Sequence, residues 1–185
     1  MTECELRAAV SRSREDGFHA LFHEYKKYVY AIVWEKLGGI GSREDAEECV
    51  SDIFTEIFLH FNEIGEGTLQ GYIATVAKRR AINSYYRLRN HESVQSLDDA
   101  SMPDVPSAET PEDTHEKNDL HRLLLAKIRQ LGEPDATIVM QRYYYNCKTS
   151  EIARNIHLNP ANVSVRLNRA LKRLKKMLLD EGISM

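Results

Sequence analysis

The sequence contains few of the residues that cross-link or anchor a protein. Its three cysteines, Cys4, Cys49 and Cys147, are odd in number and widely spaced, which argues against a disulfide framework or a zinc motif. No apolar run is long enough to span a bilayer, and the N-terminal segment lacks the apolar core of a signal peptide. We therefore expect a cytoplasmic protein that is not inserted into a membrane.

Signatures of catalysis are also scarce. The sequence contains neither a phosphate-binding glycine loop nor a nucleophile motif. His19 and His23 are four residues apart and could bind a metal from one face of a helix, but no third ligand of suitable spacing accompanies them. The sequence thus favours a protein that is not an enzyme and has no cofactor or resident metal.

The net charge of −3 hides a strong asymmetry along the chain. Residues 120–185 contain 12 Lys and Arg against 5 Asp and Glu, residues 90–119 contain 1 against 9, and residues 1–89 contain 12 against 14. The acidic middle segment also contains Pro103, Pro106 and Pro111 with few apolar residues, which predicts a flexible linker. The basic C-terminal module would attract phosphate whatever the average charge of the chain.

The basic module ends in the most informative stretch, residues 148–178. Thr149 or Ser150 can cap a first helix, and Asn159 followed by Pro160 is a strong start signal for a second. The second helix has an apolar stripe at helical spacing and six Lys and Arg off that stripe. This pattern predicts a helix-turn-helix with a basic recognition helix. An ordinary helical hairpin with a solvated basic face is the alternative.

Helical periodicity dominates the rest of the chain. Amphipathic patterns predict helices over residues 16–38, 42–61, 69–89, 120–131 and 134–144, and nothing reads as a strand. Ser42, with Asp45 three residues later, forms a capping-box-like start. Residues 62–67 form a loop whose glycines permit positive φ. We predict an all-α protein with two small helical domains, residues 1–89 and 120–185, joined by a flexible acidic linker, residues 90–119.

These features resemble the extracytoplasmic-function sigma factors, the bacterial RNA polymerase specificity subunits that keep only regions two and four. Residues 45–54, DAEECVSDIF, and 69–83, LQGYIATVAKRRAIN, resemble two consecutive helices of region two. Arg142-Tyr143 and the SEIA of residues 150–153 resemble region four. Ser51 stands where the family usually has glutamine, and Arg79 where it usually has asparagine.

The resemblance implies a protein that binds core RNA polymerase and directs promoter-specific initiation. The acidic helix that begins at Ser42 would grip the polymerase, although acids at a helix start are also favoured by the helix dipole alone. The polymerase-binding residues implied here are Asp45, Glu48, Ser51, Asp52 and Phe54.

The resemblance also implies two promoter contacts. The loop at residues 62–67 and the basic helix after it would capture the melted minus-ten element, where stacking and base burial contribute about 1–3 kcal/mol per base. The residues implied there are Asn62, Gly67, Lys78, Arg79, Arg80 and Asn83. The recognition helix would read the minus-35 duplex in the major groove. The residues implied for it are Pro160, Ala161, Asn162, Ser164, Val165, Arg166, Arg169, Lys172 and Arg173.

Two further expectations concern partners. The resemblance implies an anti-sigma factor that covers the polymerase-binding and DNA-binding faces. The main alternative function is a stand-alone helix-turn-helix regulator that binds duplex DNA without core polymerase. That alternative leaves the first module and its acidic helix without a role.

Overall fold

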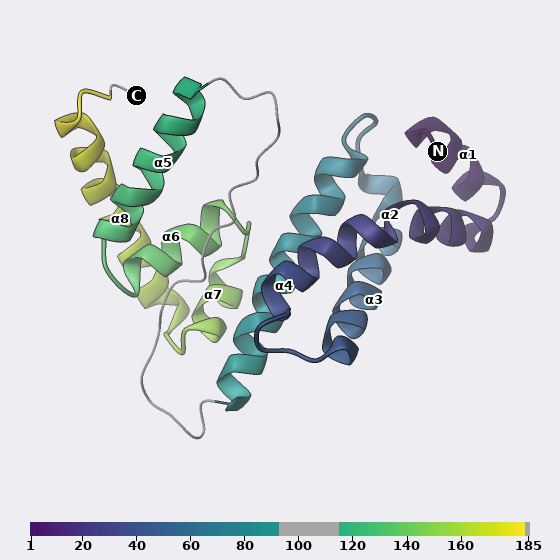
Figure 1. Cartoon of the computed structure of the whole chain (residues 1–185), viewed down its shortest axis with the longest axis horizontal. Helices are drawn as coiled ribbons and strands as arrows, with labels where there is room; N and C mark the ends of the chain where they lie inside the picture. Colours follow the sequence, from purple (N-terminus) through teal and green to yellow (C-terminus); the bar gives the residue numbers. More distant parts are fainter. Residues whose placement is uncertain (93–114, 184–185) are drawn as a thin grey trace. The chain divides into compact units, whose positions relative to one another are not determined.

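The computed structural model describes residues 1–92 and 115–183, and every regular element among them is helical (Figure 1). The prediction of an all-α fold is confirmed. The chain divides into two compact units, residues 1–96 and 97–185, each with a hydrophobic core of its own. Nowhere in the described ranges is there a helix with the length and apolarity that a membrane span requires.

Side-chain caps set the helix starts of the first unit. The hydroxyl oxygens of Thr2, Ser13 and Ser42 each accept a hydrogen bond from a backbone N–H in the first turn of the helix that follows. The capping box predicted for Ser42 is confirmed, because the Asp45 carboxylate also accepts from the Ser42 N–H at 2.8 Å. The elements are α1 (Glu3–Arg12), α2 (Arg14–Leu37), α3 (Arg43–Leu59), the 3-10 helix η1 (Phe61–Glu63) and α4 (Leu69–Glu92).

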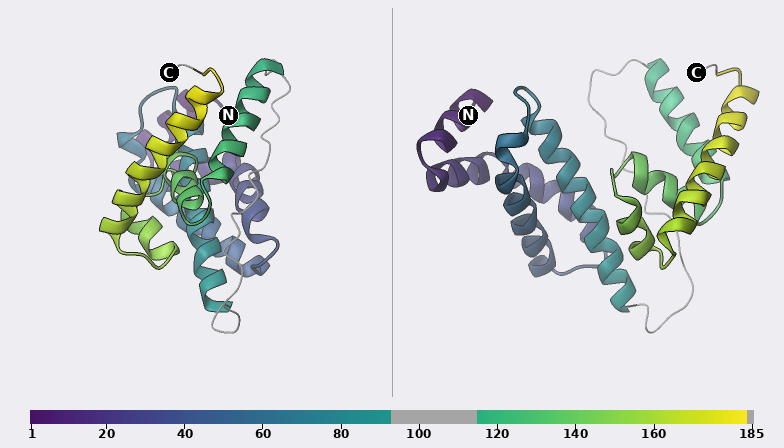
Figure 2. Two further views of the ribbon diagram at one scale, coloured as in Figure 1. Left: turned by 90° about the vertical axis from the view of Figure 1, so that its left-hand side faces the viewer. Right: turned by 180° about the vertical axis from the view of Figure 1, so that it is seen from behind.

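The core of the first unit lies between α2, α3 and α4, which pack side by side (Figure 2). Apolar positions at helical spacing, among them Val33, Ile53 and Ile73, are fully buried there. Helix α1 crosses the start of α2 at very short range: a Cβ at Gly17 would lie 2.5 Å from the Val10 Cα. A glycine at this position therefore permits α1 to pack closely on α2.

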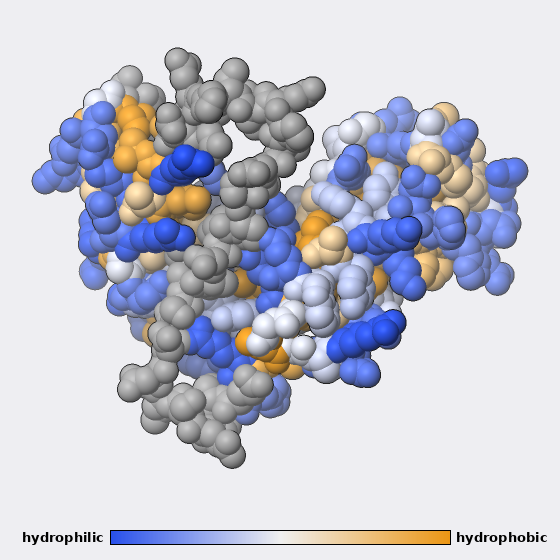
Figure 3. Space-filling model, in the orientation of Figure 1, coloured by the Kyte–Doolittle hydropathy of each residue, from blue (hydrophilic) through white to orange (hydrophobic). Residues whose placement is uncertain are grey.

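The second unit is a four-helix arrangement in which α8 packs on α5, α6 and α7. Val163, Leu174 and Leu178 from the predicted apolar stripe of the last helix are buried, and Ala170 joins them. Apolar side chains are exposed towards the end of α8 (Figure 3), where Leu179 is 49% exposed. The elements are α5 (His115–Gln130), α6 (Asp135–Tyr143), α7 (Thr149–Asn155) and α8 (Pro160–Asp180).

The helix-turn-helix is formed by α7, α8 and the turn between them. Asn159 caps α8 by accepting from the Ala161 N–H at 2.8 Å, and Pro160 is the first helical residue, as predicted. The start of α7 differs from the prediction, since Lys148 is its N-cap instead of Thr149 or Ser150. The reason is that a carboxylate in the first turn, from Glu151, accepts the Lys148 N–H at 2.7 Å.

The helices extend into both ends of the predicted linker. Helix α4 continues to Glu92 and α5 begins at His115, so residues 90–92 and 115–119 are helical. Adding residues to an existing helix is far less costly than starting one, so a polar, charged sequence does not stop it at once. The rest of the predicted linker, residues 93–114, lies outside the described residues.

Candidate functional sites

The first candidate surface is the acidic side of α3. Glu48, Ser51 and Asp52 are all exposed, and the Glu48 carboxylate lies 3.7 Å from the Arg87 guanidinium of α4. Asp45 is engaged at the helix start, where hydrogen bonds from the Ser42 N–H and hydroxyl hold the pKa of its carboxyl below the ordinary value. The exposed acids on this side leave a negative surface available to a basic partner.

Phe54 does not belong to this surface. Its side chain is fully buried, and its ring meets the Phe22 ring of α2 at 4.9 Å between centroids, edge to face. Phe54 therefore packs the core between α2 and α3. The expectation that it contacts polymerase is corrected, because a side chain without exposed area cannot touch a partner.

The second candidate surface is the basic part of α4. Arg79 and Arg80 both pair with the Glu56 carboxylate of α3, Arg80 with its Nε 2.6 Å from a Glu56 oxygen. Burial of Glu56 by itself raises the pKa of its carboxyl, but the hydrogen bonds from Arg80 and Arg79 outweigh burial, so that pKa lies below the ordinary value. The Arg79 side chain is only 17% exposed. Arg79 is thus oriented towards α3, whereas Arg80, at 42% exposed, keeps a surface position.

The remaining predicted minus-ten residues lie at the loop and on α4. Asn62 and Gly67 are exposed, and Gly67 has a φ of +74°, as its position in the loop led us to expect. Lys78 and Asn83 are half-buried on α4. Loop and helix therefore offer a mixture of exposed backbone and partly exposed polar side chains.

Sequence reasoning missed the partner of this loop, which is α1. Arg7 donates to the backbone carbonyls of Ile64 and Gly65, each at 2.9 Å, while Glu3 accepts from the Gly67 N–H at 3.0 Å. The available signal was the Glu3–Arg7 spacing of four residues, which is typical of a helical ion pair. That spacing does not reveal a partner some 60 residues away.

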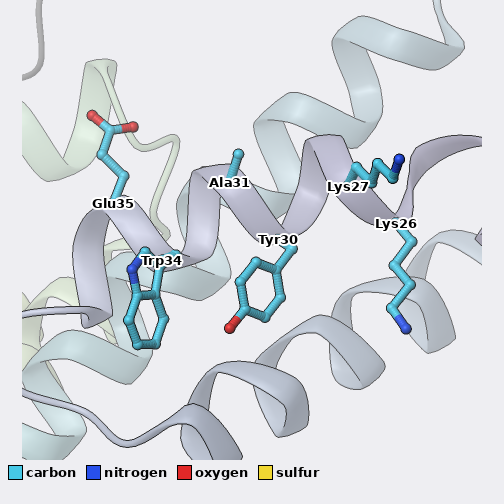
Figure 4. Close-up of a pocket in the computed structure, with 6 residues that line it drawn as sticks. All are labelled: Lys26, Lys27, Tyr30, Ala31, Trp34 and Glu35. Atoms are coloured by element: carbon cyan, nitrogen blue, oxygen red, sulfur yellow. The ribbon is translucent and has the colours of Figure 1, made fainter.

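A hollow of about 620 Å³ on α2 was also not predicted. Tyr30 and Trp34 are stacked there at 6.0 Å between ring centroids, and Trp34 is 42% exposed. Lys26, Tyr30 and Trp34 project to one side of α2 (Figure 4). The other residues that line the hollow are Lys27, Ala31 and Glu35.

The third candidate surface is the outer face of α8. Five predicted residues at its start are exposed, and so are three of the basic residues that follow. Arg166 is different, because its Nε donates to an Asp135 oxygen of α6 at 2.8 Å, and Arg173 lies 3.4 Å from the other Asp135 oxygen. The exposed residues are Pro160, Ala161, Asn162, Ser164, Val165, Arg169, Lys172 and Arg173.

The same part of the chain matches a known family. The model of Sigma-70, region 4 matches residues 121–174, which include most of α5, all of α6 and α7 and most of α8. The chain is also 25% identical over 169 residues to the ECF RNA polymerase sigma factor SigL of Mycobacterium tuberculosis, a match that covers 89% of this chain and 90% of SigL. The chain is therefore similar to the extracytoplasmic-function sigma factors over most of its length.

A second relative of the chain is the ECF RNA polymerase sigma factor BldN of Streptomyces coelicolor. It is 24% identical over 185 residues, which cover 96% of this chain and 66% of BldN. Among solved structures, the RsbN–BldN complex aligns with a TM-score of 0.33 and 18% identity, over 94% of this chain and 99% of that chain.

The helix-turn-helix lies within the part of the chain that matches Sigma-70, region 4. Helix α7 and the exposed start of α8 lie inside the matched residues, whereas Lys175 and Lys176 lie beyond them. The SigL match extends over most of the chain and includes residues of both units.

Proposed function

We propose that this protein is an extracytoplasmic-function sigma factor that directs transcription initiation: a non-catalytic, cytoplasmic protein that binds core RNA polymerase through one unit and reads promoter DNA through both. The observation that carries the proposal is the helix-turn-helix of α7 and α8, whose exposed helix start lies inside the part matched by region four. Its two folded domains, connected by an acidic linker, would contact separate promoter elements.

The polymerase-binding surface is the exposed side of α3, with Glu48, Ser51 and Asp52 at its centre and Asp45 at its edge. The exposed acids contribute little to folding, since charges in water interact weakly. Against a basic partner surface the same acids would contribute to affinity and to the rate of association.

For the minus-35 element, the start of α8 enters the major groove, where the helix end meets base edges. Asn162, Ser164 and Arg169 are the exposed polar candidates for base or phosphate contacts, with Pro160, Ala161 and Val165 beside them. Lys172 and Arg173 suit backbone phosphates. Arg166, anchored by Asp135, orients the helix on α6.

For the minus-ten element, the loop at residues 62–67 receives an extruded base while Lys78, Arg80 and Asn83 follow the backbone of the melted strand. The exposed Asn62 and Gly67 of the loop support this assignment. Arg79 is omitted from the phosphate contacts because Glu56 already pairs with it.

We also propose an anti-sigma factor that covers the acidic side of α3 and the DNA-binding faces. Supporting this proposal is the exposure of these surfaces, which leaves them available to a competitor for polymerase. A stand-alone DNA-binding regulator is less well supported, since the relatives align over both units and a regulator would need only the second.

The proposal is tested by reversing two charges on α3. Glu48→Lys with Asp52→Lys should reduce core polymerase binding by several kcal/mol, about a hundredfold or more, because like charges then face the basic partner. A pull-down of core polymerase and run-off transcription measure the effect, and circular dichroism checks that helicity is retained.

The matched control is Glu133→Lys with Asp180→Lys, which makes the same charge change on the second unit and should leave core binding intact. Undiminished core binding by the α3 variant would remove this surface from the proposal. Failure of the parent protein to bind core, together with a promoter footprint made without polymerase, would favour the stand-alone regulator.

A further inference from the structure

Helix α1 lies beside the loop between α3 and α4 in Figure 1 and in the right-hand view of Figure 2. It is anchored by Leu6, which is fully buried in the core of that unit. Glu3 and Arg7 lie on α1 at the edge of this core. Their side chains turn towards the loop instead of the solvent and are only 23% and 24% exposed.

Arg7 holds the first half of the loop by its backbone. One of its terminal nitrogens donates to the Ile64 and Gly65 carbonyls at 2.9 Å, and its guanidinium stands over the Phe61 ring, 5.5 Å from the centroid. Hydrogen bonds from a charged donor are stronger than those between neutral groups. These hydrogen bonds therefore restrain the backbone of the loop and do not involve its side chains.

Glu3 holds the second half and the start of α4. Its carboxylate accepts from the Gly67 N–H at 3.0 Å and from the Leu69 N–H at 3.4 Å, where Leu69 is the first residue of α4. The Thr68 hydroxyl donates back to the Gly65 carbonyl at 2.7 Å. Glu3 thus provides, from another helix, an anionic cap for the N-terminal end of α4.

The two side chains also hold each other. The Arg7 guanidinium lies 2.8 Å from the Glu3 carboxylate, and the hydrogen bond from Arg7 is the largest influence that lowers the pKa of that carboxyl. Asn62, Glu63 and Glu66 stay exposed around the loop that this pair restrains. The backbone is therefore restrained while the polar side chains of the loop face outward.

We propose that α1 is a positioning element for minus-ten recognition: Glu3 and Arg7 preorganise the loop at residues 62–67 so that it can receive the extruded base. The inference rests on the proposed function of this loop. A loop that is already ordered loses less conformational freedom on binding, so the base is bound more tightly and discriminated more sharply. Neither Glu3 nor Arg7 needs to touch DNA for this effect.

The test uses the full-length protein with Glu3→Ala, Arg7→Ala and the milder Glu3→Gln, which keeps an acceptor oxygen. Arg12→Ala, a charge removal at the exposed end of the same helix, is the matched control. Glu5→Ala removes the capping carboxylate of α1 itself and controls for the stability of that helix.

The first readout is amide hydrogen exchange of the free protein. Glu3→Ala should accelerate exchange at the Gly67 and Leu69 amides about tenfold or more while exchange in the core of α3 is unchanged. Glu3→Gln should give a smaller acceleration and Arg12→Ala none. Unchanged exchange in both alanine variants would overturn the claim that α1 orders the loop.

The second readout is run-off transcription with core polymerase on a promoter library randomised over the minus-ten and minus-35 positions. Both alanine variants should lose about tenfold in discrimination at a minus-ten base, equivalent to about 1.4 kcal/mol, and keep the minus-35 preference and core affinity of the parent. The positioning role would be overturned by a variant whose loop amides exchange faster but whose minus-ten discrimination is unchanged. Equal losses of discrimination at the minus-ten and minus-35 elements would also overturn it. If the parent itself gives no promoter-dependent transcription, the proposed function fails, whatever hydrogen exchange shows about the loop.

Discussion

At the scale of single residues, Glu56 organises the contact between α3 and α4. Its side chain is 14% exposed and receives the guanidinium groups of Arg79 and Arg80, which follow each other on α4. Without the Glu56 carboxylate, the two neighbouring guanidinium groups would repel each other. The carboxylate therefore stabilises the packing of the helix proposed to contact the melted strand.

Glu56→Gln should destabilise the first unit by about 1–2 kcal/mol at neutral pH, a modest value because water still screens the group. The folded pKa of Glu56 lies below the ordinary value, so its contribution is present above that ordinary pKa and is lost as pH falls through the folded pKa. The stability gap between parent and variant should therefore narrow as pH falls below the ordinary pKa of a glutamate and close once the pH is below the folded pKa. Urea unfolding followed by circular dichroism at several pH values measures this gap.

The control for this prediction is Glu47→Gln. Glu47 pairs with Arg43 on the same helix, but its side chain is 55% exposed, so the loss should stay below about 0.5 kcal/mol. A gap for Glu56→Gln that is constant from neutral to acid pH would show that the carboxylate is not what stabilises this contact.

At the scale of elements, α8 combines two tasks along one helix. One side packs on α5, α6 and α7, while the opposite side is exposed and basic. Arg166 and Arg169 are both in its first half, yet Arg166 pairs with Asp135 and Arg169 is exposed. Two arginines three residues apart therefore have different expected roles.

Arg169→Ala should weaken promoter binding by about 1–3 kcal/mol at one minus-35 position if the contact is bidentate to a base. Lys175→Ala should weaken all promoters alike and reduce the salt slope by about one. Arg166→Ala should act on all sequences and lower the melting temperature of the second unit, because its guanidinium, although 41% exposed, pairs with an Asp135 carboxylate that is only 13% exposed. Titrations of holoenzyme with promoter duplexes at several salt concentrations distinguish the three patterns, and a base-specific loss for Arg166→Ala would return it to the base-reading set.

At the scale of the whole molecule, the two units have separate hydrophobic cores. Ile53 is fully buried in the first unit and Ile138 in the second. Because each of these cores is built from residues of one unit, we expect the two units to unfold as separate cooperative transitions.

Ile53→Ala should destabilise the first unit by about 2–5 kcal/mol through lost burial and the cavity left behind, and leave the second transition in place. Ile138→Ala is the reciprocal variant and should shift only the second transition. Differential scanning calorimetry of the full-length parent and both variants measures the two transitions. A single transition that either substitution shifts as a whole would show that the units fold as one body.

The sequence by itself determined the helices after α1 and most of their ends. Helical periodicity selects the buried side of each helix, and caps such as Ser42 with Asp45 and Asn159 with Pro160 act within one turn, so both signals are local. The basic recognition helix and the exposed acids of α3 could be predicted for the same reason. The ends of the predicted linker could not, because helix propagation from α4 and into α5 depends weakly on local composition.

Only the tertiary structure decided which of the predicted side chains face outward. Arg79 turns to Glu56, 23 residues earlier, Arg166 turns to Asp135, 31 residues earlier, and Arg7 reaches the loop 57 residues later. A charged residue at a helix edge has solvent and several possible partners within reach. Its choice depends on which helix packs beside it, and periodicity in the sequence contains no information about that neighbour.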